Sequence, residues 1–193
     1  MIDIAQNSAL QNSNLFKVQQ PQLKTINVIE NKTYDEERAL YNVKDTYIKN
    51  CTFAGPRDGE SSLKESRNIV VDSCNFSLRY PLWHNQKYVL KNSNLDEKTR
   101  APIWYANNGY IDSCKIESVK CLREFKNSVV KGEYLAGFQR ILTLIIVKSL
   151  KLKLNIKGHV DSIKNPKSGK ITVDSVGEII LEVLLWKKCP NYY

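Results

Sequence analysis

A motif of eight residues recurs five times between residues 46 and 135, and this repetition constrains the fold more than any other feature. The copies are TYIKNCTF (46–53), IVVDSCNF (69–76), YVLKNSNL (88–95), GYIDSCKI (109–116) and SVVKGEYL (128–135). Successive copies start 23, 19, 21 and 19 residues apart when their aligned positions are compared. A period near twenty residues is typical of a solenoid, in which each repeat stacks on its neighbours.

Each copy has the same four positions, and we call the set of equivalent residues in successive copies a column. The lead column is apolar: Ile48, Val71, Leu90, Ile111, Val130. The turn column is Asn50, Ser73, Asn92, Ser113, Gly132, and the column after it is Cys51, Cys74, Ser93, Cys114, Glu133. An apolar column closes the motif: Phe53, Phe76, Leu95, Ile116, Leu135. Asn and Gly tolerate a left-handed backbone, so the turn column predicts a bend between two strands.

A second segment of each repeat, which we call the arm, also recurs. It starts at an apolar residue that lies eight positions before the next lead residue: Leu40, Leu63, Leu82, Ile103, Leu122. The alternation of apolar and polar residues predicts strands in both segments, and no copy has room for a helix of ten residues. One copy therefore predicts one coil of a parallel β-helix, and the chain is predicted to be all-β with about five to six coils.

The whole chain, residues 1–193, is predicted to form a single domain. Residues 1–23 form an N-terminal segment, residues 24–158 the coils, and residues 159–193 a C-terminal cap or tail. A cap is expected because the last coil would otherwise expose unpaired backbone groups. Within the predicted cap, KNPKSGK (164–170) indicates a turn between two strand-like runs.

Composition narrows the classes of function. No signal peptide is visible, and the longest apolar run, ILTLIIV (141–147), is too short to span a bilayer, so we expect a cytoplasmic protein without a membrane segment. No CxxC pair exists, and a buried column explains Cys51, Cys74 and Cys114, so no metal site and no cofactor are predicted. Residues 120–170 hold 12 Lys/Arg and 3 Asp/Glu. This basic region could attract an acidic polymer, but no nucleic-acid-binding motif accompanies it, and a solvated solenoid end explains it as well.

The two positions that follow the first arm residue are the richest in chemistry. The first reads Tyr41, Lys64, Trp83, Trp104, Arg123 and the second reads Asn42, Glu65, His84, Tyr105, Glu124. If the arm is a strand, the first column points outward and the second points inward or lies at a bend. Aromatic rings beside cations suit a sugar or an acidic polymer, which makes these residues candidates for ligand binding: Lys64, Trp83, Trp104, Arg123. Stacked aromatic residues that only stabilise a sheet explain the column equally well.

A catalytic role rests on the acids of the arm. The candidates for acid/base chemistry on a glycan are Glu65, His84, Arg100, Tyr105 and Glu124. A polar ladder that is purely structural is the alternative. No two adjacent repeats stack Asp residues on one face, since Asp72 and Asp112 alternate with Lys49, Lys91 and Lys131 in their column.

Several segments resemble domain-of-unknown-function family 3737, an uncharacterised bacterial family of pectin-lyase-like right-handed parallel β-helices. The resemblance covers residues 24–135 and 156–180 and is carried by CTFAGPRDGESSLKESRNI (51–69), CNFSLRYPLWHN (74–85), LDEKTRAPIWYANNGYIDSCKI (95–116) and HVDSIKNPKSGKI (159–171). It implies a fold and no reaction, and relative to the family this chain is shortened after Leu135.

The sequence therefore predicts a soluble bacterial β-helix that acts as a binding or scaffold surface. Carbohydrate or another acidic polymer is the predicted partner. The alternative is a carbohydrate-active enzyme of the polysaccharide lyase or glycoside hydrolase type that acts on acidic glycans.

Overall fold

The computed structural model describes residues 2–3, 20–55, 61–118, 124, 128–130, 133–134, 144–145, 151–164 and 170–180. Side chains are described for residues 20–55, 61–118, 124, 128–130 and 175–179. All regular elements in these ranges are β-strands. Accordingly, no helix in the described ranges is long and apolar enough to cross a bilayer.

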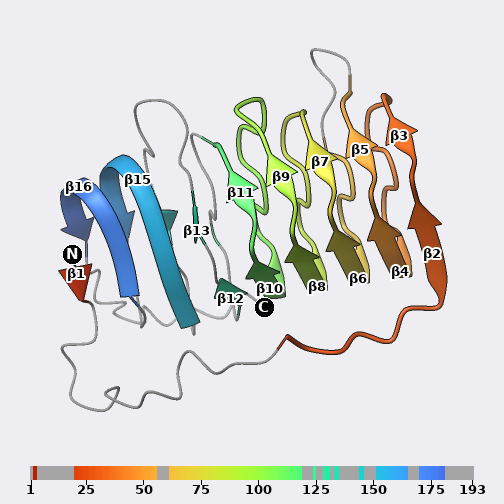
Figure 1. The fold of residues 1–193 in the computed structure, drawn as a ribbon, viewed down its shortest axis with the longest axis horizontal. Helices are drawn as coiled ribbons and strands as arrows, with labels where there is room; N and C mark the ends of the chain where they lie inside the picture. Colours follow the sequence, from red (N-terminus) through yellow and green to blue (C-terminus); the bar gives the residue numbers. More distant parts are fainter. Residues whose placement is uncertain are drawn as a thin grey trace, which may run out of the picture.

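One side of the molecule is a long sheet in which the predicted lead column is in register (Figure 1). Parallel pairing joins Ile48 to Val71, Val71 to Leu90, Leu90 to Ile111 and Ile111 to Val130. This confirms the predicted parallel β-helix. The sheet consists, in spatial order from one end, of β2 (Asn27–Glu30), β4 (Lys44–Lys49), β6 (Arg67–Asp72), β8 (Gln86–Lys91), β10 (Asn107–Asp112) and β12 (Val129–Val130), followed by the C-terminal strands.

A second sheet of short strands faces the first and contains the closing column. Its strands are β3 (Thr33–Tyr34), β5 (Thr52–Phe53), β7 (Asn75–Phe76), β9 (Asn94–Leu95) and β11 (Lys115–Ile116), all parallel. The turn column connects the two sheets with a left-handed backbone, as at Asn50 and Ser73, where φ is 55° in both. The chain thus turns the corner of every coil at the position that the sequence indicated.

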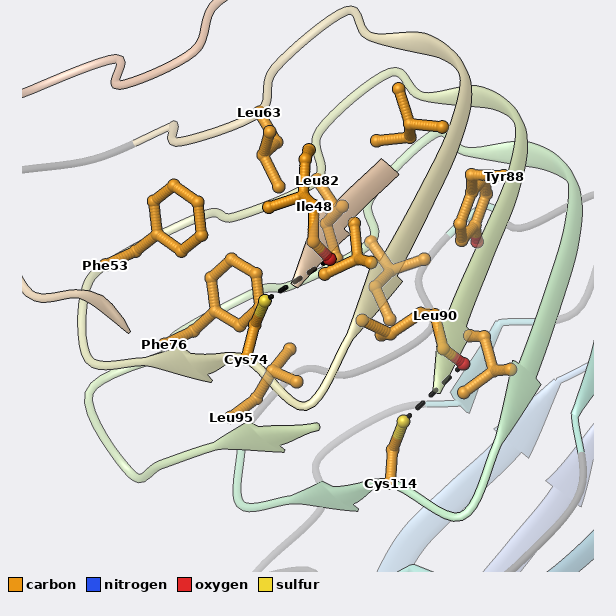
Figure 2. Close-up of a cluster of buried hydrophobic side chains, with 14 of the residues drawn as sticks. Ile48, Phe53, Leu63, Cys74, Phe76, Leu82, Tyr88, Leu90, Leu95 and Cys114 are labelled. Carbon is orange, nitrogen blue, oxygen red and sulfur yellow. Dashed lines mark hydrogen bonds between the residues drawn. The ribbon is translucent and has the colours of Figure 1, made fainter. Parts of the chain in front are cut away.

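The interior between the sheets is a continuous apolar core (Figure 2). The rings of Phe53 and Phe76 stack at a centroid distance of 4.8 Å with planes 5° apart. Cys51, Cys74, Ser93 and Cys114 are all buried, and the Cys74 thiol donates to the carbonyl of Ile48 on the preceding coil. The backbone N–H of Cys74 donates to Ser93 Oγ at 3.1 Å, which confirms that this column stacks in successive coils.

The arm is not a strand, which corrects the prediction of an extended segment there. Its backbone is left-handed at alternate residues; in one coil, φ is 64° at Ser61, 55° at Leu63 and 60° at Glu65. The arms nevertheless bond to one another, because Leu63 N–H donates to Ala39 O on the preceding coil and Glu65 N–H donates to Trp83 O on the following one. Alternation between two faces holds only for extended chains. In the arms that begin at Leu63, Leu82 and Ile103 the first residue is buried, and the two residues that follow it are partly or fully exposed.

A further coil precedes the five copies of the motif and lies within the predicted coil range of residues 24–158. Ile29 pairs with Ile48, Asn31 has the left-handed backbone of the turn column, and Tyr34 stacks on Phe53 at 5.2 Å. This copy begins 19 residues before the next, but Lys32 replaces the small residue of the column that follows the turn. The segment before it, residues 20–26, crosses the strands of the first sheet, where Asn68 Nδ2 donates to Lys24 O at 2.7 Å.

The C-terminal strands extend the long sheet. β15 (Lys151–Lys164) pairs with β12, β13 (Glu133–Tyr134) and β14 (Leu144–Ile145), and β16 (Lys170–Ile180) lies parallel beside β15. β1 (Ile2–Asp3) pairs antiparallel with the first two residues of β16. The predicted boundary between coils and cap at residue 158 falls inside β15. Of the residues assigned to the cap, Ile163 and Lys164 pair with β14, and β16 lies one strand further out than β15.

Candidate functional site

Five aromatic side chains from two adjacent coils meet on the outer side of the arms, and we call them the arm cluster: Tyr80, Trp83, His84, Trp104, Tyr105. Trp83 and Trp104 occupy the same arm position in consecutive coils, so their rings stack at a centroid distance of 5.5 Å with planes 9° apart. Tyr80 lies 5.9 Å from Trp83 and 6.4 Å from Trp104 in tilted orientations. None of the five side chains belongs to the apolar core between the sheets, so the cluster is not needed to fill the interior of the solenoid.

Both faces of the Trp83 ring are occupied. Trp104 of the following coil covers one face, and Lys64 of the preceding coil places its Nζ 4.5 Å from the ring centroid on the other. A sugar that stacks on an aromatic ring needs a free face, so Trp83 does not offer that kind of platform. Its indole Nε1 is also buried and has no hydrogen-bond partner in the described part of the chain.

The accessible part of the cluster is formed by His84 and Tyr105. Tyr105 is 39% exposed and stacks on Trp104 at 5.2 Å, and His84 is exposed and lies 5.1 Å from Tyr105. Both residues have a left-handed backbone, with φ of 60° at His84 and 55° at Tyr105. The second arm column was predicted either to point inward or to lie at a bend. At His84 and Tyr105 it lies at a bend, and both side chains are exposed.

Of the two predicted acids of the arms, Glu65 is held in place by contacts with two neighbouring side chains. Its Oε2 accepts a hydrogen bond of 2.7 Å from the Tyr41 hydroxyl on the preceding coil, and its Oε1 lies 4.0 Å from Lys64 Nζ. The hydrogen bond to Glu65 raises the pKa of Tyr41. Glu124 lies three coils further along, which corresponds to about 14 Å at the spacing of neighbouring strands. Glycosidases hold their two carboxyl groups about 5 to 9.5 Å apart, and Glu65 is turned away from Glu124.

The remaining predicted site residues lie apart from the cluster or outside the description. Arg100 is exposed in the loop before the arm of its coil. Arg123 lies outside the described residues. Tyr80 belongs to the cluster but was missed, because its column otherwise contains Arg38, Ser61 and Ala101 and shows no recurrence.

A second polar group lies on the outer face of the long sheet and is internally satisfied. Asp72 accepts hydrogen bonds from Tyr47 at 2.6 Å, Asn92 at 2.9 Å and Ser73 at 3.0 Å, and Lys91 Nζ lies 3.2 Å away. Burial raises the pKa of Asp72, but these hydrogen bonds outweigh burial and lower the pKa to about 2. The hydrogen bond that the Tyr47 hydroxyl donates to Asp72 raises the pKa of Tyr47 to about 12. This group stabilises the sheet and leaves no lone pair directed at a ligand.

Other chemistry is sparse in the described part of the chain. There, no three His, Cys, Asp or Glu side chains come together in a way that could hold a metal ion. The thiols of the interior are shielded, since burial raises the pKa of Cys74 to about 11 and that of Cys114 to about 12. Reactive cysteines require the opposite shift.

Comparison with known proteins gives one match. A family model described as "Protein of unknown function (DUF3737)" matches residues 27–127 and 146–189. No curated protein and no solved structure matches the chain. The matched residues include all arms of the described coils.

Proposed function

We propose, starting from the fact that this chain belongs to the DUF3737 family of proteins of unknown function, that it is a binding protein which holds a carbohydrate chain at the arm cluster without cleaving it. The observation that carries the proposal is the exposed pair of His84 and Tyr105 above the stacked tryptophans. Amphipathic rings that are fixed in place and partly exposed contribute contact area at little entropic cost.

The shape of the arm face supports a polymer as ligand. Successive coils place equivalent arm positions at a regular step of about 4.8 Å along the solenoid. A linear chain that lies along this face meets Glu65, His84 and Tyr105 in neighbouring coils, with Lys64 beside them. Lys64 keeps its Nζ over Trp83 with 23% of its side chain exposed, and it supports an acidic group on the ligand.

The energetics of Trp83 support a role beyond stability. A buried indole N–H without an acceptor costs about 1–3 kcal/mol. An aromatic ladder selected only for stability would avoid this cost with a phenyl ring. Local features that violate the rules of a well-packed structure are expected at functional sites.

The experiment is a glycan array followed by affinity measurement on the glycans that bind. His84→Asn and Tyr105→Asn should each weaken binding at least tenfold, and Asn tolerates the left-handed backbone at both positions. Lys87→Asn is the matched control, because Lys87 is exposed and has the same left-handed backbone, with φ of 54°, but lies on β8 in the long sheet and not in an arm. This variant should bind as the wild type does.

Two outcomes would overturn the proposal. One is wild-type affinity of Tyr105→Asn for every glycan that the protein binds. The other is release of reducing sugar from acidic polysaccharides by the wild-type protein, since this would make it an enzyme.

A further inference from the structure

The first coil ends the solenoid with an unpaired strand edge, and we call its outer side, formed by residues 26–34, the open end (Figure 1). In the described part of the chain, β2 pairs only with β4 and β3 pairs only with β5. Natural sheets protect such edges with lysine, proline or a bulge within the strand, and β2, with the sequence NVIE, has none of these devices. The outer backbone groups of β2 are therefore available to pair with another strand.

Two apolar columns of the long sheet stop at the open end. The outward column is in register along the sheet: Val28, Tyr47, Val70, Val89, Tyr110, Val129. Val89 in the middle of this column is fully buried, whereas Val28 is 66% exposed. The inward lead column begins at Ile29, which is only partly buried, although its equivalent Ile48 on the next coil is fully buried. A strand with two adjacent apolar residues would continue both columns and bury both side chains.

The column that follows alternates in charge from coil to coil. Its members are in register along the sheet: Glu30, Lys49, Asp72, Lys91, Asp112. Lys91 Nζ lies 3.2 Å from Asp72 Oδ2, so neighbours in this column can form an ion pair. Glu30 is exposed and forms no ion pair with the described residues. Opposite charges on neighbouring strands stabilise a sheet and like charges destabilise it. Glu30 therefore favours lysine or arginine at the facing position of an added strand.

The rest of the first coil is acidic as well. Residues 26–42 contain four Asp/Glu and two Lys/Arg, and Arg38 Nε lies 3.8 Å from Glu37 Oε1 on the same coil. A second first coil would bring like charge to this surface. The strand β16 would do the same, because it contains one lysine and two acids. Electrostatic complementarity therefore favours a basic partner over another copy of this chain.

We propose that the open end binds an extended peptide segment of another protein, which reads apolar, apolar, basic and adds as a strand parallel to β2. Main-chain hydrogen bonds hold such a strand, and the side-chain columns select its sequence. The chain itself has this pattern in Val89, Leu90 and Lys91, which lie on the preceding coil in the same register. The binding surface contains no residue of the arm cluster, so the proposal is independent of glycan binding.

A residue beyond the bend of the peptide would meet the second sheet. Tyr34 stacks on Phe53 at 5.2 Å with planes 11° apart, and its other face meets no ring among the described residues. An apolar residue five positions after the second apolar residue of the motif has the place of Leu95 relative to Leu90, and it would cover this face. A peptide of eight residues therefore reaches both strands of the open end.

The probe is a synthetic peptide with the sequence YVLKNSNL, which is that of residues 88–95. Its affinity for the full chain is measured by fluorescence anisotropy of a labelled peptide. A peptide with glutamate in place of its lysine should bind about fivefold more weakly, because like charges then face each other at Glu30. The reversed sequence LNSNKLVY has the same composition but cannot match the columns in a parallel strand, so it should bind at least tenfold more weakly.

Three protein variants locate the contact. Glu30→Lys should reverse the preference, so that the glutamate peptide binds about fivefold more tightly than the lysine peptide. Val28→Lys should weaken both peptides at least tenfold, because the apolar contact is lost. Gln86→Lys places the same residue at an exposed position of β8, which has partner strands on both sides, and this variant should bind like the wild type. Circular dichroism verifies that all three variants keep the fold.

Several results would overturn the proposal. One is the absence of binding of the lysine peptide to the wild-type chain, and another is equal affinity for the lysine and glutamate peptides. An unchanged preference in Glu30→Lys, or equal effects of Val28→Lys and Gln86→Lys, would also contradict it. Sedimentation velocity of the chain without peptide tests the other occupant. A wild-type dimer that Val28→Lys abolishes would show that a second copy of the chain covers the open end and not a peptide.

Discussion

The phenol ring of Tyr88 occupies the space in which a side chain at Gly109 would lie. A Cβ atom at Gly109 would be 2.4 Å from Tyr88 Cζ and 2.5 Å from its hydroxyl oxygen. Tyr88 and Gly109 are paired in register on β8 and β10, and both are buried. The largest side chain of this interior column therefore depends on the residue with the smallest side chain on the next coil.

Gly109→Ala is expected to lower the free energy of unfolding by about 1–3 kcal/mol, the range for an overpacked core. Urea denaturation measures this. The double variant Gly109→Ala/Tyr88→Leu should lose less than the sum of the two single variants, since leucine vacates the contested space. Additive losses would show that the close approach is not the cause.

Tyr88→Phe is expected to raise the free energy of unfolding by about 1 kcal/mol. The Tyr88 hydroxyl is buried and has no hydrogen-bond partner in the described ranges, so its removal relieves a desolvation cost. Tyr47→Phe is the control, because the Tyr47 hydroxyl donates to Asp72 at 2.6 Å and its loss should destabilise the protein. Equal effects of both variants in a thermal unfolding experiment would contradict this prediction.

Asp72 should give the protein an acid-sensitive part of its stability. Its pKa falls from 3.8 to about 2 on folding, so its contribution is present above pH 4 and is lost as the pH falls towards 2. A shift of this size corresponds to about 2 kcal/mol. The difference in unfolding free energy between wild type and Asp72→Asn should therefore be about 2 kcal/mol larger at pH 7 than at pH 2. A difference that is independent of pH would show that the hydrogen bonds do not favour the carboxylate.

Ile103→Leu is expected to stabilise the protein by up to about 1 kcal/mol, because a β-branched residue is strained in the left-handed region. Ile103 has φ of 63°, and leucine occupies the equivalent position in the four other arms. Ile111→Leu, at an extended position of β10, is the control and should bring no gain, since strands favour β-branched residues. Differential scanning calorimetry compares the two, and an equal shift in both variants would rule out the backbone as the cause.

The long sheet could be predicted because its columns recur in type. A lead residue in every coil, a turn residue two positions later and a small residue after it define the register without reference to any contact. The first coil lies within the predicted coil range, but its copy of the motif is hard to recognise, because Lys32 interrupts the small column and Tyr34 closes it with a ring that also appears in loops. Residues 27–34 are recognised as a coil because Ile29 pairs with Ile48, and the spacing of residues in the sequence does not show this pairing.

The arm could be located from the sequence, but its conformation could not be inferred. Leucine and isoleucine have no preference for a left-handed backbone, and the stacked coils impose it through hydrogen bonds to both neighbours, as at Leu63 and Glu65. The outward direction of both following columns results from that conformation. The aromatic composition indicated a cluster of Trp83 and Trp104, whereas the addition of Tyr80 and the coverage of both Trp83 faces required coordinates.

The left-handed backbone of the second arm position changes how sequence variation in the family should be interpreted. At Glu65, His84 and Tyr105, glycine is the residue that the main chain accommodates most easily. Drift without selection should therefore move these positions towards glycine or asparagine. Relatives that retain a ring at the positions of His84 and Tyr105 do so against the preference of the backbone, and their retention marks selection on the side chain itself. Family members that keep the fold but lack a ring at both positions are expected not to bind the proposed carbohydrate ligand.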